Sequence, residues 1–267
     1  MIGIFDSGIG GLTIFKAVAN VLSSYELLYL GDTARMPYGN RSSELIYQFT
    51  VEGVEYLFQQ GCELVIVACN TMSAEALRKL QHEWLPRHYP DRRVLGVIRP
   101  IAEVAASVSK TKRIGVVGTR ATVHSKAYER ELQAQHSSTH VFQEACPLLV
   151  PLIEEGWHTR GETMKFIRYY LRPLKAKHID TLILGCTHYP VLYKQFQQTV
   201  GKNITVLDAP TIVADKLVGY LHRHPEIESK LKKGNQHRFL VTDITQIFQK
   251  NAEAFLGKSI KLEKVVL

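Results

Sequence analysis

Two apolar segments that lie far apart in the chain end in the same way. Residues 65–71 read Val-Ile-Val-Ala-Cys-Asn-Thr, and residues 182–188 read Leu-Ile-Leu-Gly-Cys-Thr-His. Each begins with consecutive aliphatic side chains, which is typical of a strand buried on both faces of a sheet. The pattern therefore predicts two buried strands, each of which delivers one cysteine, Cys69 or Cys186, at its carboxyl end.

Similar apolar runs, separated by amphipathic segments, recur along the chain. We expect further strands at residues 2–5, 27–30, 94–98, 114–117, 204–207 and 239–242. We expect helices at about residues 42–60, 73–86, 101–108, 125–135, 161–176 and 211–222, with one more near the end of the chain. This alternation predicts an α/β fold with parallel sheets. Eight or more strands and the repeated cysteine segment favour two related halves. A single barrel is the alternative, because length and strand count do not separate the two folds.

Polar side chains follow these predicted strands. They are Asp6, Asp32, Cys69, Thr119, Cys186 and Asp208. Ligands of parallel sheets bind beyond the carboxyl ends of the strands, so this distribution indicates an enzyme. The turn after the first strand, Asp6-Ser7-Gly8-Ile9-Gly10-Gly11, has glycines that allow backbone N–H groups to approach an anion. It matches neither a Walker motif nor a dinucleotide fingerprint, and a tight turn without a ligand is the alternative.

Composition narrows the class of protein. The 267 residues, 45% hydrophobic and 22% charged, are enough for one large domain or two smaller ones. No apolar run reaches the roughly 18 residues of a membrane span, and the first residues already resemble a core strand, so we predict a cytoplasmic protein. Four cysteines without a CxxC pair predict reduced thiols. The net charge of +8 comes from scattered residues and predicts a basic surface, with a nucleic-acid partner as the alternative.

Four chemistries could use Cys69 and Cys186: a lone nucleophile, a disulfide redox pair, a metal site, or an acid and base on either side of a carbon acid. The last fits the repeat best, because racemisation removes a proton on one face of a carbon and returns it on the other. A thiol at the start of a helix is expected to have a lowered pKa. Asp6 and His188 would tune the two thiols, and hydrogen-bond donors would stabilise the developing charge. Candidate donors are Ser7, Asn70, Thr71 and Thr187. Cys62 and Cys146 are expected to be structural.

Several longer motifs together resemble glutamate racemase, within the aspartate/glutamate racemase superfamily. They cover residues 6–13, 31–39, 68–71, 118–122, 146–156 and 184–190, in the order of that family. The resemblance implies two pseudo-symmetric α/β domains with the active site in the cleft between them. The first would take residues 1–95 and 210–267, and the second residues 96–209.

The resemblance also implies an activity and a set of site residues. The protein would racemise L-glutamate to D-glutamate without a cofactor or metal, supplying D-glutamate for peptidoglycan synthesis, and would form a homodimer. Cys69 and Cys186 would be the two bases, with Asp6 assisting the first, and His188 with Glu154 assisting the second. Glu155 is the alternative to Glu154. The implied substrate-binding residues are Ser7, Tyr38, Gly39, Asn70, Thr71, Thr119, Thr122 and Thr187.

Three alternatives stay open from the sequence. They are a racemase for aspartate or another amino acid, a binding protein whose positive charge serves a nucleic acid or a topoisomerase, and a metal-dependent lyase or hydrolase. Met72, beside Thr71, departs from the family pattern, and so does Arg99 before Pro100.

Overall fold

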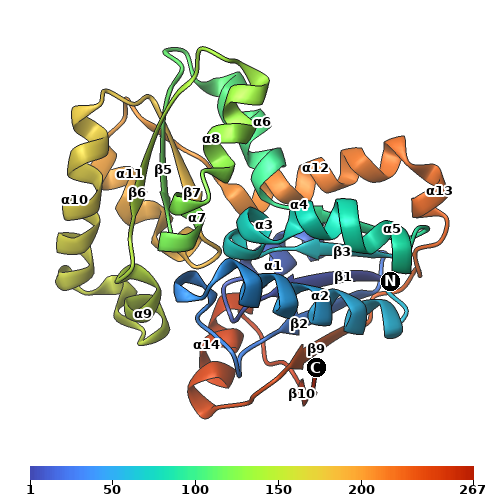
Figure 1. The fold of residues 1–267 in the computed structure, drawn as a ribbon. Coiled ribbons are helices and arrows are strands. Elements are labelled where there is room, and N and C mark those ends of the chain that lie inside the picture. The colour runs from blue at the N-terminus through green and yellow to red at the C-terminus, as the bar shows by residue number, and fades with distance from the viewer.

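The computed structural model describes residues 1–267 and contains two parallel sheets flanked by helices (Figure 1). The first sheet has the strand order β10-β9-β2-β1-β3-β4, and the second has the order β6-β5-β7-β8. The first comprises β1 (Ile2–Asp6), β2 (Leu27–Gly31), β3 (Leu64–Val67), β4 (Arg93–Gly96), β9 (His237–Val241) and β10 (Leu262–Lys264). The second comprises β5 (Arg113–Gly118), β6 (His140–Ala145), β7 (Thr181–Gly185) and β8 (Thr205–Val206). Every pairing within them is parallel, as the apolar runs predict.

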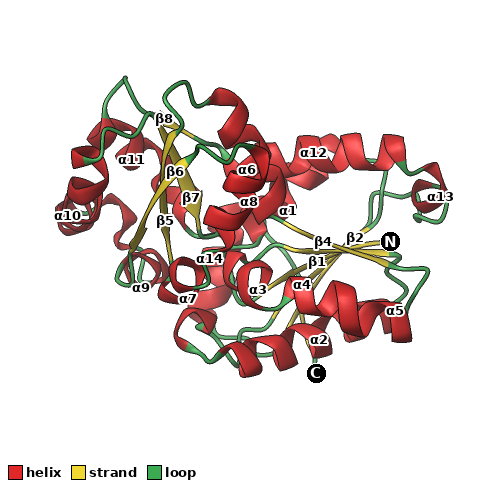
Figure 2. Cartoon of the chain, turned by 45° about the horizontal axis from the view of Figure 1, so that its top comes forward, coloured by secondary structure: helices red, strands yellow, loops and turns green.

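Helices cover both faces of each sheet, and the strands of the two sheets run in different directions (Figure 2). The α-helices are α1 (Leu12–Val21), α2 (Ser43–Gln59), α3 (Asn70–Glu75), α4 (Leu77–Lys79), α5 (Leu85–His88), α6 (Ile98–Val108), α7 (Arg120–His124), α8 (Ala127–Gln135), α9 (Leu149–Glu154), α10 (Gly161–Ala176), α11 (Tyr193–Val200), α12 (Ala209–Arg223), α13 (Pro225–Glu228) and α14 (Gln246–Leu256). Three short 3₁₀ segments are η1 (Tyr38–Asn40), η3 (Trp157–Thr159) and η4 (Tyr189–Leu192). None of these helices combines the length and the apolar character that a bilayer crossing requires.

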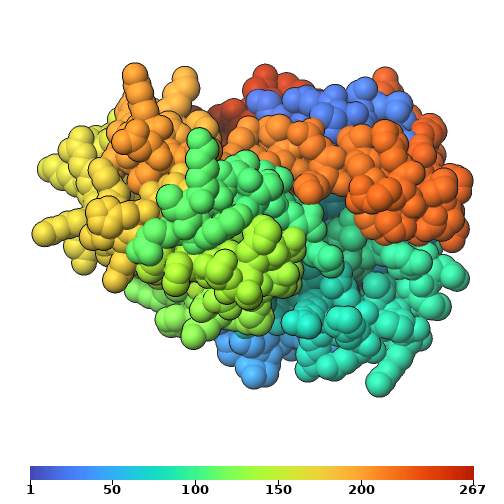
Figure 3. Space-filling model, turned by 90° about the horizontal axis from the view of Figure 1, so that it is seen from above, coloured from blue at the N-terminus to red at the C-terminus, as the bar shows by residue number.

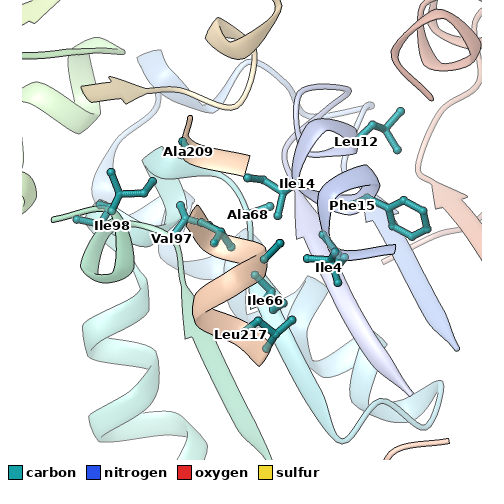
Figure 4. Close-up of a cluster of buried hydrophobic side chains, with 14 of the residues drawn as sticks. Ile4, Leu12, Ile14, Phe15, Ile66, Ala68, Val97, Ile98, Ala209 and Leu217 are labelled. Carbon is teal, nitrogen blue, oxygen red and sulfur yellow. The ribbon is translucent and has the colours of Figure 1, made fainter. Parts of the chain in front are cut away.

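One hydrophobic cluster of 39 buried residues joins the two sheets. Figure 4 shows part of it, where Ile4 of β1 and Ile66 of β3 lie near Leu217 of α12 and Val97 before α6. The same cluster contains Ile114 of β5. Helix α12 contacts both α1 and α6, and in Figure 3 it runs in orange between the blue α1 and the green helices of the second half. We call the first sheet with its helices the first half of the molecule, and the second sheet with its helices the second half. Burial of apolar surface therefore holds the two halves together.

The opposite faces of the sheets have separate cores. Because side chains alternate along a strand, Phe5 of β1 points away from Ile4 and packs with α2. Gly53 of α2 is needed there, since an added Cβ would lie 2.2 Å from the ring of Phe5. In the second sheet, Val117 and Leu184 pack against α10 and α11 in a third cluster. The cores leave the carboxyl ends of both sheets for the loops that carry the polar residues.

Several predicted boundaries were wrong. The strand expected at residues 94–98 ends at Gly96, and α6 begins at Ile98 because Pro100 in a first helical turn needs no N–H bond. The helix expected from Ser73 begins at Asn70, directly after Cys69. It ends at His88, close to the predicted stop near Pro86, and a π-helical turn over Leu80–Trp84 precedes the proline.

Other elements were split or missed. The helix expected at residues 125–135 begins only at Ala127, after Lys126 adopts a left-handed conformation with φ of 55°, and α7 precedes it. Strands β6 and β10 were not predicted, since their exposed polar positions hide the apolar pattern of an edge strand. The proposed division into residues 1–95 with 210–267, and 96–209, remains a prediction.

Candidate active site

A cavity of about 110 Å³ lies beyond the carboxyl ends of both sheets. This is many times the roughly 10–15 Å³ that one water needs by the same kind of measure. Cys69 follows β3 of the first sheet and Cys186 follows β7 of the second, and both line the cavity. Other predicted site residues in the lining are Ser7, Tyr38, Gly39, Asn70, Thr71, Thr119, Glu154, Thr187 and His188. The two sheets therefore present one cysteine each to the same small space.

Cys69 is a buried thiol at the start of α3. Its Sγ lies 3.5 Å from Oγ of Ser7, and its residue is 6% exposed. Burial, and then the nearby charge of Asp6, raise the pKa of Cys69 to about 12. The expectation that the helix start would lower this pKa is therefore wrong, because desolvation and a neighbouring carboxylate outweigh the helix dipole. Without a substrate, Cys69 carries its proton at neutral pH.

Cys186 has a different environment. Its Sγ lies 3.8 Å from Nδ1 of His188, and Nε2 of His188 lies 2.9 Å from Oε1 of Glu154. Burial by itself lowers the pKa of His188, but its interactions with Cys186 and Glu154 outweigh burial and raise the pKa to about 10. His188 is thus a buried cation beside one of the two sulfurs. Glu155 is exposed at the end of the same helix, so the geometry selects Glu154 as the partner of His188.

Asp6 lies behind the cavity wall and is fully buried. Its carboxylate accepts hydrogen bonds from the backbone N–H groups of Gly8 at 3.1 Å and Gly11 at 2.9 Å. It also accepts one from Oγ1 of Thr187 at 3.4 Å, and so it contacts both halves of the site. Burial raises the pKa of Asp6, while the charge of His188 and these hydrogen bonds oppose the rise.

The glycine-rich turn does bring backbone N–H groups to an anion, but Gly8 and Gly11 bind the side chain of Asp6. The glycines also allow close packing. A Cβ on Gly10 would lie 2.3 Å from Oγ1 of Thr187 and 2.6 Å from Nδ1 of His188. Small residues are therefore required where the first half meets the second.

Three threonine hydroxyls connect the halves beside the cavity. Oγ1 of Thr71 lies 2.9 Å from Oγ1 of Thr119 and 3.4 Å from Oγ1 of Thr122. Thr119 also caps α7, since its side chain accepts from the N–H of Thr122. Thr122 is fully buried and does not line the cavity, so it supports the other two hydroxyls. Gly39 packs directly against Thr119, where an added Cβ would approach to 2.8 Å.

Two of the predicted strand-end acids have other positions. Asp32 is buried and bonded to Tyr38, to Arg35 and to Oγ1 of Thr242, so it holds Tyr38 in the cavity wall without lining the cavity. Asp208 is exposed and bonded to Thr211 at 2.7 Å, and it is absent from the cavity wall. Asp208 follows β8, which is a two-residue edge strand of the second sheet.

Some lining residues were not among the predicted site residues. They are Gly8, Met36, Pro37, Asn40, Arg120, Cys146, Pro147, Val150 and Pro151. Cys146 is fully buried, with its Sγ 3.7 Å from the carbonyl oxygen of Glu144. Burial raises its pKa above the usual range. Four of these residues, Cys146, Pro147, Val150 and Pro151, belong to the motif at residues 146–156, which could have indicated this part of the cavity wall. The motif has few reactive side chains, namely Cys146 and the two glutamates.

A larger cavity of about 570 Å³ lies between α4, α6, α8 and α12. Figure 3 views the molecule from the side of α12 and α8. The lining of this larger cavity contains no cysteine, and its titratable side chains are those of arginine, lysine and histidine residues together with Glu103, Glu131 and Tyr220. Of these two cavities, only the smaller is lined by Cys69 and Cys186. No group of three or more His, Cys, Asp or Glu is arranged to hold a metal ion, and all four cysteines are free thiols.

Comparison with known proteins bears on this geometry. The model of the Asp/Glu/hydantoin racemase family matches residues 12–217. The glutamate racemase of Chlorobaculum parvum is 42% identical over 259 residues, which cover 97% of this chain and 93% of the relative. The chain belongs to the glutamate racemase family.

Solved glutamate racemases share the whole fold. The RacE1 enzyme of Bacillus anthracis superposes with a TM-score of 0.92 at 35% identity, covering 100% of this chain and 97% of that one. The Francisella tularensis glutamate racemase, solved in complex with D-glutamate, gives 0.89 at 32% identity, covering 99% and 97%. The two-sheet architecture of this glutamate racemase family member is therefore that of the family.

Proposed function

We propose that this protein interconverts L- and D-glutamate by two-base proton transfer at the α-carbon, without a cofactor. The observation that carries the proposal is the pair of cysteines, Cys69 and Cys186, which come from different sheets and line one cavity. Racemisation requires one proton-transfer group on each face of the carbon, and this arrangement supplies two groups of the same kind.

The two sulfurs have different neighbours. The cationic His188 lies beside the sulfur of Cys186, whereas the high pKa of Cys69 keeps that residue a thiol. In one direction, the Cys186 thiolate removes the α-proton, and Cys69 donates its proton to the opposite face. The reverse direction starts from the Cys69 thiolate and the Cys186 thiol. Each turnover therefore exchanges the states of the two sulfurs, and Asp6 and His188 influence the two states through charge.

Removal of the α-proton places negative charge on the substrate carboxylate, and fixed hydrogen-bond donors would stabilise it. The side chains available in the cavity wall are Ser7, Asn70, Thr71, Thr119 and Thr187. Tyr38 and Gly39 close the wall from the first half, and Thr122 supports the threonine cluster. Glutamate as substrate is supported by the relatives, which are named glutamate racemases and match this chain over 97% and 100% of its length. We further propose that the D-glutamate serves peptidoglycan synthesis and that the protein acts as a homodimer in the cytoplasm.

The test is racemisation in heavy water, without added cofactor and with excess chelator. We expect L-glutamate to lose its optical rotation while deuterium enters the α-position. The same measurement with L-aspartate separates the closest alternative. Racemisation of aspartate but not glutamate would overturn the substrate assignment, and dependence on a metal would overturn the two-thiol mechanism.

A further inference from the structure

A buried tyrosine of the second half contacts a residue that lines the cavity from the first half. The hydroxyl of Tyr128, on α8, donates a hydrogen bond of 2.6 Å to Oδ1 of Asn70, on α3. Tyr128 is fully buried and Asn70 is 4% exposed. The ring of Tyr128 also packs on the end of β7, since an added Cβ on Gly185 would lie 3.0 Å from it. The contact therefore spans the two halves directly beside Cys186.

This hydrogen bond determines which end of the Asn70 amide faces the cavity. The Tyr128 hydroxyl has no other hydrogen-bond partner, so its proton is satisfied only when Asn70 presents its oxygen. The amide nitrogen of Asn70 makes no hydrogen bond within the protein, and Asn70 lines the cavity. The amide group thus offers donors, and not an acceptor, to the bound molecule.

We propose that Tyr128 is a positioning residue that fixes the Asn70 amide with its N–H groups toward the α-carboxylate of the substrate. The inference rests on the proposed function for the identity of that carboxylate. If the amide rotated by half a turn, its oxygen would face a carboxylate oxygen, and two acceptors would repel each other. Tyr128 acts through Asn70 and does not touch the reacting atoms. Since the two residues come from different halves, the donor is correctly oriented only when the halves are in contact.

The test measures binding. Calorimetric Kd values are compared for glutamate and for glutamate α-amide, in which a carboxamide replaces the α-carboxylate. In the wild type, the fixed donor favours the carboxylate. In Y128F the ring still packs on Gly185, but the Asn70 amide is free to turn. We expect glutamate to bind about tenfold more weakly and the preference over the α-amide to shrink by a similar factor.

Two comparisons separate positioning from a general structural effect. Y193F removes another tyrosine hydroxyl, which donates a hydrogen bond of 3.2 Å to the carbonyl oxygen of Val206. Tyr193 does not line the cavity, so this variant should leave both Kd values unchanged. In an N70A background, Y128F should have no additional effect on glutamate binding, because the partner is already absent. Equal losses from Y128F with and without Asn70, or an unchanged preference in Y128F, would overturn the proposal.

Folding of each variant is checked by thermal unfolding. If Y128F does not fold, N70D tests the same orientation, because one carboxylate oxygen still accepts from Tyr128 and the other faces the substrate. We then expect loss of glutamate binding with retained binding of the α-amide, and wild-type affinity for glutamate would contradict the proposal. Failure of the wild type to racemise glutamate would refute the proposed function, whereas the Kd comparison concerns only Tyr128.

Discussion

Nε2 of His188 lies 2.9 Å from Oε1 of Glu154, and the other ring nitrogen faces the sulfur of Cys186 at 3.8 Å. One imidazole thus connects a carboxylate to a thiol inside the second half of the molecule. Cys69 has no such cation and has Asp6 nearby instead. The two cysteines of the repeated pattern are equivalent in sequence but not in electrostatic environment.

Replacement of either cavity cysteine should abolish racemisation. In C69S or C186S, one face of the α-carbon lacks a competent acid or base, because a serine hydroxyl is a far weaker acid than a thiol. We expect turnover to fall by about 10²–10⁴-fold or more, the range of a lost general acid or base. A chiral glutamate assay measures the loss. C62A is the control, since Cys62 is buried in the core of the first half, and it should lower the unfolding temperature while it retains turnover.

The Glu154–His188 pair predicts a pH-dependent stability. The pKa of folded His188, about 10, lies above the ordinary value of 6.5, so protonation stabilises the folded state. This contribution is fully present below about pH 6.5 and is lost as pH rises through about 10. E154Q removes one interaction that raises the pKa. Unfolding by denaturant should therefore show the greatest difference between wild type and E154Q near pH 6, and the difference should shrink toward pH 10.

The neighbouring glutamate supplies a matched control. Glu155 is exposed and makes no contact with His188, so E155Q should follow the wild type at every pH and keep its turnover. A constant difference between wild type and E154Q across the range would refute the linkage to His188.

Alkylation can test the protonation state of Cys69. Because only the thiolate reacts, and the pKa of Cys69 is about 12, iodoacetamide at pH 8 should modify Cys69 slowly in the folded protein. D6N removes the charge that contributes to this high pKa, and Cys69 should then react faster. Peptide mass spectrometry follows each cysteine, with Cys62 as the internal reference. Rapid modification of Cys69 in the wild type, at the rate of a free cysteine, would contradict the thiol form.

Close packing at Gly10 predicts a cost for any side chain there. An added methyl group would overlap with Thr187 and His188, so G10A should separate the halves and destabilise the fold by about 1–3 kcal/mol. Turnover should fall as well, because His188 is displaced from Cys186. G161A is the matched control, since no atom lies within 4 Å of an added Cβ at the start of α10. Equal stability and turnover of the two variants would argue against this contact.

The sequence by itself determined the parallel strands and the positions of Cys69 and Cys186, because buried strands need continuous apolar runs and a parallel sheet exposes its carboxyl ends to ligands. Local patterns of this kind are readable because a strand buried on both faces needs an apolar side chain at nearly every position. They could not locate β6 or β10, whose edge positions tolerate polar residues.

Only the tertiary structure decided how distant groups meet. It selected Glu154 over Glu155, brought the hydroxyl of Thr187 to the carboxylate of Asp6, and buried Met72 in the core of the first half. Arg99 is exposed on α6, where it pairs with Glu103. The physical reason is that pKa values and hydrogen-bond partners depend on burial and on charges within a few ångströms. Those neighbours can come from segments far apart in the chain: Glu154 and His188 are 34 residues apart, and Asp6 and Thr187 are 181 residues apart. The pattern supplied two cysteines, and the packing made one of them a neutral thiol and gave the other a cationic partner.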